Sequence, residues 1–207
     1  MKILLAMPSF YKKDGTLFHG RKRLIIPITL PYLAGLTPRH HDIHILDEHH
    51  TPIDTSMDYD LVGLTVLGSA EKRAIEVARA FRKRGIKVVA GGIHASLAPE
   101  RLQEHVDSIV IGEAELVWEQ VLADAQNGRL KPRYKADRLC EMKNLPHPRF
   151  DLLDFSKFRF KYFPVQTTRG CPHGCKFCEV QTIYGRKYRF RPVGEVIEEI
   201  KEIGRAS

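Results

Sequence analysis

Three cysteines lie within eight residues of one another, in the segment TTRGCPHGCKFCEV. They are Cys171, Cys175 and Cys178, and their C-x3-C-x2-C spacing supplies one thiolate fewer than a closed four-ligand metal site requires. Three thiolates on a cubic iron–sulfur cluster leave one iron open to bind a further molecule. The missing ligand therefore indicates a chemically active 4Fe-4S centre.

Two other uses of the cysteines are possible. Disulfide frameworks are typical of small secreted domains, whereas this chain has 207 residues and its start, MKILLAMPSF, lacks the basic region and cleavage site of a signal peptide. We therefore expect a reducing, cytoplasmic location. A Cys3His zinc site could include His173, although this side chain would have to fold back between two ligands that flank it. Zinc remains the alternative to iron and sulfur.

The composition limits the possible partners. Lys and Arg number 33 against 25 Asp and Glu, which gives a formal net charge of +8. These cations are scattered along the chain rather than gathered in a recognisable RNA- or DNA-binding motif, so we expect no nucleic-acid partner. A solvated basic surface or contacts with anionic cofactors account for the charge. No run of 18 apolar residues occurs, and the sequence predicts no membrane span.

The elements that would position a site alternate between strands and helices. Apolar runs predict five strands, over residues 2–7, 42–46, 61–66, 86–90 and 108–111. Helical spacing predicts one helix near residues 70–81, with Ser69 as N-cap and Gly85 after its end, and another over 116–125 that Gly128 closes. This pattern predicts an α/β fold, namely a doubly wound, Rossmann-like, parallel five-stranded sheet.

Ligands of such a sheet bind outside the carboxyl ends of its strands. The loops after the first, third, fourth and fifth strands read MPSFYKKDG, GLTVLGSA, AGGIHAS and GEAE. Their glycines let the backbone approach a ligand closely, their hydroxyl groups can donate hydrogen bonds, and the helices that follow them favour anions. Four such loops at one edge predict a ligand-binding cleft.

The cysteine segment resembles that of the radical S-adenosylmethionine enzymes. The resemblance implies that the open iron binds the amino and carboxylate groups of S-adenosylmethionine, and that one electron from the cluster cleaves this cofactor to a 5′-deoxyadenosyl radical. It also implies that Phe177 packs beside the cluster and the adenine, and that a flavodoxin or ferredoxin donates the electron.

Residues 1–135 resemble the cobalamin-binding domain of the cobalamin-dependent radical S-adenosylmethionine enzymes, notably in VVAGGIHASLAPE, in VDSIVIGEAE with the following Trp118, and in NGRLK. The resemblance implies a cobalamin-binding domain at 1–136, a linker at 137–162 and an N-terminal fragment of the radical S-adenosylmethionine domain at 163–207. The residues that it assigns to cobalamin are Pro8, Ser9, Thr65, Gly68, Ser69, Gly91, Gly92, His94, Ser96, Gly112, Glu113 and Glu115.

The histidines depart from one common cobalamin pattern. Many cobalamin proteins carry D-x-H-x-x-G after the first strand, whose His coordinates cobalt, and this motif is absent here. Asp42-Ile43-His44 lies on the second strand and lacks the glycine, so we expect no protein His on the lower face of cobalamin. The five histidines over residues 40–50 are expected to be solvated rather than metal ligands. His94 could contact a cofactor or hydrogen-bond its own loop.

The second domain is expected to begin with a strand over residues 163–168 and to continue, after the cysteine loop, with a helix over 192–203. Only 29 residues follow Cys178, whereas a closed eight-fold barrel needs about 250 residues. The sequence thus predicts only the first β-α unit of an incomplete TIM-like barrel, and a fragment of a larger enzyme. Three arginines follow the cysteine loop: Arg186, Arg189 and Arg191. We expect them either to pair with glutamates of the helix or to be solvated, or else to contact a cofactor.

The resemblance implies transfer of a methyl group from cobalamin to an unactivated carbon of a small-molecule or lipid-like substrate. Cyclisation or rearrangement within the same family is an alternative. A methylthiotransferase would need three further cysteines, and only Cys140 remains. A non-catalytic corrinoid carrier and a zinc-stabilised module are alternatives from other classes.

Overall fold

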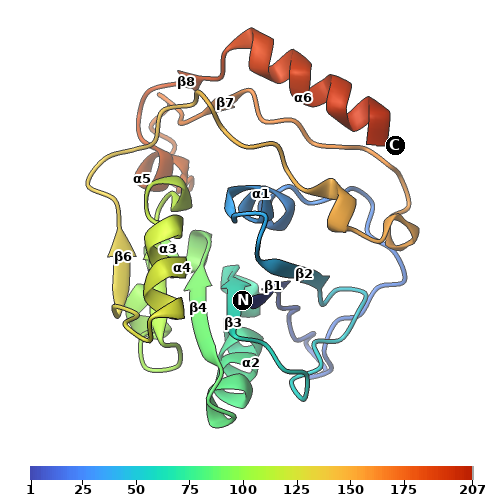
Figure 1. Ribbon diagram of the computed structural model, residues 1–207, viewed down its shortest axis with the longest axis vertical. Coiled ribbons are helices and arrows are strands. Elements are labelled where there is room, and N and C mark those ends of the chain that lie inside the picture. The colour runs from blue at the N-terminus through green and yellow to red at the C-terminus, as the bar shows by residue number, and fades with distance from the viewer. Residues whose placement is uncertain (207) are drawn as a thin grey trace.

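The computed structural model describes residues 1–206, and it is built around a six-stranded sheet in which all neighbouring strands run parallel (Figure 1). The strand order is β2-β1-β3-β4-β5-β6. The strands are β1 Lys2–Met7, β2 Asp42–Asp47, β3 Leu61–Thr65, β4 Lys87–Gly91, β5 Ser108–Ile111 and β6 Arg133–Lys135. The predicted fold class is confirmed.

The sheet has one strand more than the five that we predicted. β6 is three residues long, and only its middle residue, Tyr134, is buried. It pairs with β5 over Ile109–Arg133, Val110–Tyr134 and Ile111–Lys135. A single buried residue between two exposed cations carries no apolar periodicity, so no sequence pattern predicts this strand.

Helices cover both faces of the sheet, because successive residues of a strand point to opposite sides. In β1, Leu4 and Ala6 pack in the core beneath α2 (Glu71–Lys83) and α3 (Ile93–Leu97). Ile3, Leu5 and Met7 pack on the other face, beneath α1 (Thr29–Leu36) and α4 (Trp118–Gln126). The doubly wound arrangement is therefore confirmed.

Two details of the predicted helices need correction. Ser69 does not cap α2, since it lies inside a single 3-10 turn, Gly68–Ala70, and the residue before α2 is Ala70, which makes no side-chain cap hydrogen bond. The helix α1 was not predicted at all, because its sequence TLPYLAGL contains Pro31 and Gly35, which are weak helix formers. Proline is tolerated there because it lies in the first turn.

The chain after β6 is largely irregular until Thr168, apart from the 3-10 turns Phe150–Leu152 and Phe155–Lys157. These turns pack on Ile26 from the loop before α1, in a small cluster with Phe158. Two further 3-10 turns, Pro99–Arg101 and Ala114–Leu116, belong to the sheet domain.

The cysteine loop lies between two short strands. β7 (Thr168–Arg169) pairs antiparallel with β8 (Arg189–Phe190), with α5 (Val180–Tyr184) between them and α6 (Val193–Ala206) after them. The strand predicted over residues 163–168 is wrong except at Thr168. The helix predicted over 192–203 is confirmed as α6, which runs along one end of the molecule near α1 (Figure 1). Membership of a barrel stays a prediction.

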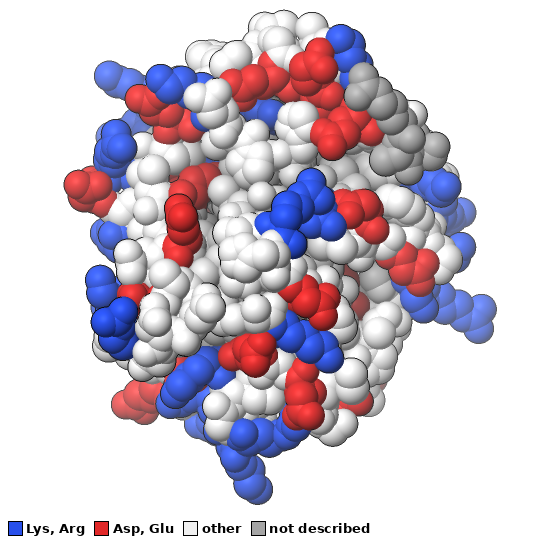
Figure 2. Space-filling view, in the orientation of Figure 1, with Lys and Arg blue, Asp and Glu red and all other residues white. Residues whose placement is uncertain are grey.

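Charged side chains of both signs are interspersed on the face seen in Figure 2, in keeping with the scattered cations of the sequence. Within residues 1–206, none of the helices combines the length and the apolar character that crossing a membrane requires.

The backbone after β4 generates a first prediction. Gly92 has a φ of +93°, and a Cβ there would lie 2.8 Å from Thr65 Oγ1. Gly92→Ala should therefore combine backbone strain with a steric clash. Gly85 has a φ of +81° in open space, so Gly85→Ala should cost only the strain, about 1–2 kcal/mol. Urea unfolding should show a larger loss of stability for Gly92→Ala, and equal losses would contradict this account.

Candidate functional site

A cavity of about 240 Å³ opens at the carboxyl ends of β3, β4 and β5. The sheet, α1, the start of α4 and the segment after the irregular region all contribute to its wall. Its lining residues are Ile28, Thr29, Tyr32, Leu33, Leu36, Gly63, Leu64, Thr65, Val89, Gly91, Gly92, Val110, Gly112, Glu113, Ala114, Glu115, Trp118, Gln166, Arg169 and Tyr184. The cavity thus lies at the edge of the sheet where the sequence predicted a cleft.

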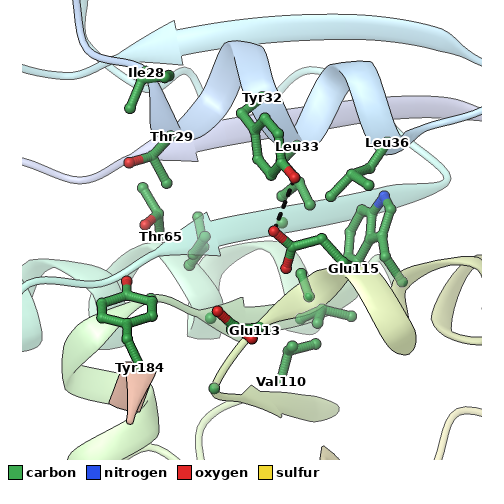
Figure 3. Close-up of a pocket in the computed structure, with 18 of the residues that line it drawn as sticks. Ile28, Thr29, Tyr32, Leu33, Leu36, Thr65, Val110, Glu113, Glu115 and Tyr184 are labelled. Carbon is green, nitrogen blue, oxygen red and sulfur yellow. Dashed lines mark hydrogen bonds between the residues drawn. The ribbon is translucent and has the colours of Figure 1, made fainter. Parts of the chain in front are cut away.

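One side of the cavity is an apolar slot. Leu33 and Leu36 project from α1 above the sheet, and Val110 lies below them (Figure 3). Trp118 is held in place because its Nε1 donates a hydrogen bond of 2.8 Å to Thr37 Oγ1. Such a slot excludes water and accepts an apolar or aromatic group.

Two glycines keep the slot open on the side of the sheet. A Cβ at Gly91 would lie 3.8 Å from Val110 Cβ, at ordinary contact distance, and would occupy space that lines the cavity. A Cβ at Gly63 would lie 3.0 Å from Leu5 Cδ2 and 3.8 Å from Trp118 Cη2. The absence of side chains at both positions allows a flat group to approach the backbone closely.

The cavity is also lined by polar groups. Tyr32 Oη donates a hydrogen bond of 2.8 Å to Glu115 Oε1, as Figure 3 shows. Thr29, Thr65 and Tyr184 add hydroxyl groups to the lining (Figure 3). The cavity therefore combines an apolar slot with a few polar groups near the edge of the sheet, which is the usual composition of a small-molecule site.

A buried ion network adjoins these polar groups. Arg169 Nη1 lies 2.9 Å from Glu113 Oε1 and 2.6 Å from Glu115 Oε1, and Arg189 Nη2 lies 2.6 Å from Glu113 Oε1. The backbone N–H of Cys140 donates to Glu113 Oε2 at 2.8 Å. The side chain of Glu113 is only 1% exposed and that of Arg169 only 9%.

The surroundings favour the charged forms of Glu113 and Arg169. Burial acts to raise the pKa of Glu113, but hydrogen bonds from Arg189 and Arg169 outweigh it and hold the pKa below its usual value. Burial acts to lower the pKa of Arg169, and the charge of Glu115 together with hydrogen bonds to Glu113 and Glu115 raises it. Burial and the charge of Glu115 raise the pKa of Tyr32. Glu113 and Arg169 are thus ionised at neutral pH, while Tyr32 keeps its proton and donates a hydrogen bond to Glu115.

Half of the twelve residues that the sequence assigned to cobalamin line the cavity, namely Thr65, Gly91, Gly92, Gly112, Glu113 and Glu115. The others, Pro8, Ser9, Gly68, Ser69, His94 and Ser96, lie outside its lining. What any of the twelve binds stays a prediction.

Three of the residues outside the cavity have structural partners. Ser9 is fully buried, and its N–H donates 3.0 Å to Glu48 Oε2. Ser96 Oγ donates to Gly92 O at 2.8 Å and accepts from Gly112 N at 2.9 Å, so it ties two loops together. His94 contacts the carboxylate of Glu71, rather than the loop backbone that we had considered.

The pKa of Glu71, which lies outside the network, is also shifted strongly. Hydrogen bonds from Arg101 and His94 lower the pKa of Glu71 to about 2, against the opposing effect of burial.

Sequence reasoning missed several residues of the cavity. The α1 residues Tyr32, Leu33 and Leu36 were missed together with their helix, although the apolar run ITLPYLAGL offered a signal. Arg169 and Tyr184 were missed because they reach the cavity from a segment more than 50 residues after Glu113 and Glu115 in the chain. No local spacing could have connected them.

The three cysteines of the motif lie at the surface of the protein. Cys175 is exposed, Cys171 and Cys178 are partly exposed, and all are free. Among the described residues, no three His, Cys, Asp or Glu side chains are arranged to hold a metal ion. Phe177 is 91% exposed. The donor set fits an iron–sulfur cluster or zinc chemically, and both the cluster and the role of Phe177 stay predictions.

Cys140 is a different kind of cysteine. It is buried beside the ion network, with Sγ 3.5 Å from Arg169 Nη1. Burial and the charges of Glu115 and Glu113 raise the pKa of its thiol to about 12. It is therefore a neutral thiol at physiological pH.

Of the five histidines over residues 40–50, His40 and His44 are exposed as we expected, whereas the other three are less solvated. The side chain of His50 is 6% exposed and contacts the Phe158 ring edge-on. His49 Nδ1 lies 2.8 Å from Asp47 Oδ1, and Asp47 also pairs with Arg23 at 2.6 Å. These side chains are packed and paired because the loop after β2 folds against the loops at 19–23 and 157–158.

Two of the arginines after the cysteine loop have different partners. Arg191 pairs with Glu199 of α6, as one of our expectations had it, with side chains that are 3% and 2% exposed. Arg189 instead reaches Glu113 of the sheet domain.

Comparison with known proteins assigns the sheet domain. Residues 21–122 match the family model of the B12 binding domain. The chain is 38% identical over 189 residues, or 88% of its length, to bacteriochlorophyllide d C-8(2)-methyltransferase of Chlorobaculum tepidum, and covers 42% of that protein. It is 32% identical over 97% of its length to bacteriochlorophyllide d C-12(1)-methyltransferase of the same organism, of which it covers 44%.

A more distant relative is the hopanoid C-2 methylase of Rhodopseudomonas palustris, which is 24% identical over 96% of this chain, with 40% of that protein covered. The chain thus spans less than half the length of these curated relatives. The cavity lies at the carboxyl edge of a sheet within the matched B12 binding domain, and the similarity to the methyltransferases continues through the cysteine segment. The chain therefore contains a B12 binding domain and is similar along most of its length to these methyltransferases.

Proposed function

We propose that this chain forms the cofactor-binding part of a radical S-adenosylmethionine methyltransferase that uses cobalamin and a 4Fe-4S cluster. The observation that carries the proposal is the cavity at the carboxyl ends of β3, β4 and β5, three strands that lie inside the region that matches the B12 binding domain. In this proposal residues 1–136 bind cobalamin, 137–162 are the linker, and 163–207 begin the domain that binds S-adenosylmethionine.

The size and lining of the cavity limit which part of cobalamin it takes. A volume of about 240 Å³ lies below the range of about 300–1,000 Å³ that is typical of sites for drug-sized ligands. The slot between Gly91, Val110 and Trp118 therefore suits a planar aromatic group, such as the base of the nucleotide tail, while the corrin lies outside over the loops. Thr29 and Thr65 would hydrogen-bond polar atoms of the tail.

Cys171, Cys175 and Cys178 would hold the cluster through three thiolates. When bound, the cluster supplies an electron to S-adenosylmethionine, and cobalamin supplies the methyl group that is transferred. The chain itself would hold these cofactors next to each other and exclude water from the slot. Phe177, which is exposed here, would cover the cluster and the adenine, and a flavodoxin or ferredoxin would be the electron donor.

The names of the relatives support methyl transfer as the reaction, because two are called methyltransferases and one a methylase. The same names give bacteriochlorophyllide d and a hopanoid as the molecules on which those relatives act. We propose a small-molecule or lipid-like substrate for this protein on the same basis.

Filling the slot should weaken cobalamin binding. Gly91→Val adds a side chain that β-strands accommodate well at a position that lines the cavity, so the affinity for hydroxocobalamin should fall at least tenfold with the fold intact. The only tryptophan of the chain, Trp118, lies in the slot, and quenching of its fluorescence by the corrin measures the binding.

Gly194→Ala is the matched control, since a Cβ at this position of α6 meets nothing within 4 Å. It should bind hydroxocobalamin as the wild type does. Wild-type affinity in Gly91→Val, with an unchanged circular dichroism spectrum in both variants, would place the cofactor elsewhere.

The cysteine motif is tested by anaerobic reconstitution with iron and sulfide. The wild type should become brown and absorb broadly near about 400 nm, as thiolate-ligated iron–sulfur clusters do. Cys175→Ala should lose this absorption and its bound iron, because only two thiolates remain in the loop. Cys140→Ala, which removes the buried cysteine outside the motif, should keep both. A colourless wild-type protein that retains zinc would overturn the cluster assignment.

A further inference from the structure

The wall of the cavity includes residues that lie outside the match to the B12 binding domain. That match ends at residue 122, whereas Gln166, Arg169 and Tyr184 also line the cavity. Arg169 is two residues before Cys171, and Tyr184 lies on the helix that follows the cysteine loop. The segment that carries the cysteines therefore completes the cavity.

Four side chains join this segment to the sheet domain, and we call them the latch: Glu113, Glu115, Arg169 and Arg189. Glu113 accepts hydrogen bonds from both arginines, at 2.9 Å from Arg169 Nη1 and 2.6 Å from Arg189 Nη2. Glu115 accepts a further hydrogen bond from Arg169 at 2.6 Å. The acidic half of the latch belongs to the loop after β5, and the basic half to β7 and β8.

The latch holds both ends of the cysteine segment. Arg169 lies on β7 before the cysteines and Arg189 on β8 after them, and the two strands pair directly. Arg189 Nη2 also donates to Tyr184 O at 3.0 Å, and Cys171 N donates to Gly185 O at 3.1 Å. A movement of the latch would therefore move the whole segment from Gly170 to Tyr188 as a unit.

Because its charges are buried, the latch should be either closed, with all its ion pairs formed, or open, with the arginines and glutamates fully separated. The side chains of Glu113, Glu115 and Arg169 are each less than 10% exposed. A charge that loses its partner in such a place is strongly destabilising, because it is neither hydrated nor neutralised. Partial separation is therefore costly, and the latch has the character of a two-state element.

We infer that the latch couples occupation of the cavity to the position of the cysteine loop. A ligand in the cavity contacts Arg169 and Tyr184 only when the latch is closed, so it favours the closed state and holds the cysteine segment against the sheet domain. By reciprocity, a closed latch strengthens binding of that ligand to the same extent. Arg169 is thus a positioning residue for both sites. The identification of the ligand as cobalamin rests on the proposed function.

Hydrogen–deuterium exchange of the full chain tests the coupling directly. In the wild type, hydroxocobalamin should slow amide exchange in peptides that cover residues 170–188. Arg169→Met should speed exchange in these peptides even without cobalamin, since the latch loses the arginine that contacts both glutamates. The same variant should bind hydroxocobalamin at least tenfold more weakly, as measured by quenching of Trp118.

Arg191→Met is the matched control. It breaks an Arg–Glu pair that is equally buried and lies in the same part of the chain, but Arg191 does not line the cavity. Its cobalamin affinity should stay within about twofold of the wild type, and cobalamin should still slow exchange over 170–188.

The outcomes separate this inference from the proposed function. If the wild type binds hydroxocobalamin, and Arg169→Met binds it equally or Arg191→Met loses as much affinity, the coupling through the latch is wrong and the proposed function stands. If the wild type does not bind hydroxocobalamin, both fall together.

Discussion

The parallel direction of the sheet is the constraint on which the other features depend. Because the sheet strands all run the same way, their carboxyl ends meet at one edge, and the loops that leave β3, β4 and β5 converge there. The helices that return the chain must cover the two faces, so the space between α1, α4 and the end of the sheet is the place where a cavity forms. Gly63 and Gly91 have no side chains, so the sheet does not fill that space with side-chain atoms at these positions.

The edge also determines where the rest of the chain can attach. After β6 the chain returns over the same end of the sheet, and the only buried charges available on the loop after β5 are those of Glu113 and Glu115. Two arginines satisfy these carboxylates and exclude water from them. The attachment of the cysteine segment is therefore electrostatic at its centre, whereas the small apolar cluster of Ile26, Phe150 and Phe158 supports the linker.

Most of the sheet could be predicted from sequence because its strands are buried runs of apolar residues. The helix α1 and the strand β6 could not, since Pro31 and Gly35 weaken the helical pattern and Tyr134 is the only buried residue of its strand. At the site, the sequence indicated the glycine loops and the two glutamates. It could not indicate Arg169 and Arg189 as their partners, because the pairs are separated by 56 and 76 positions for Glu113, and only the tertiary fold brings them together.

The hydroxyl group of Ser96 joins two loops at the wall of the cavity. It donates to the carbonyl of Gly92 and accepts from the amide of Gly112, so one oxygen atom spans the loops after two neighbouring strands. Gly92 and Gly112 both line the cavity, so the two hydrogen bonds join neighbouring parts of its wall. A single serine, which does not itself line the cavity, thus ties together the two loops that form this part of its wall.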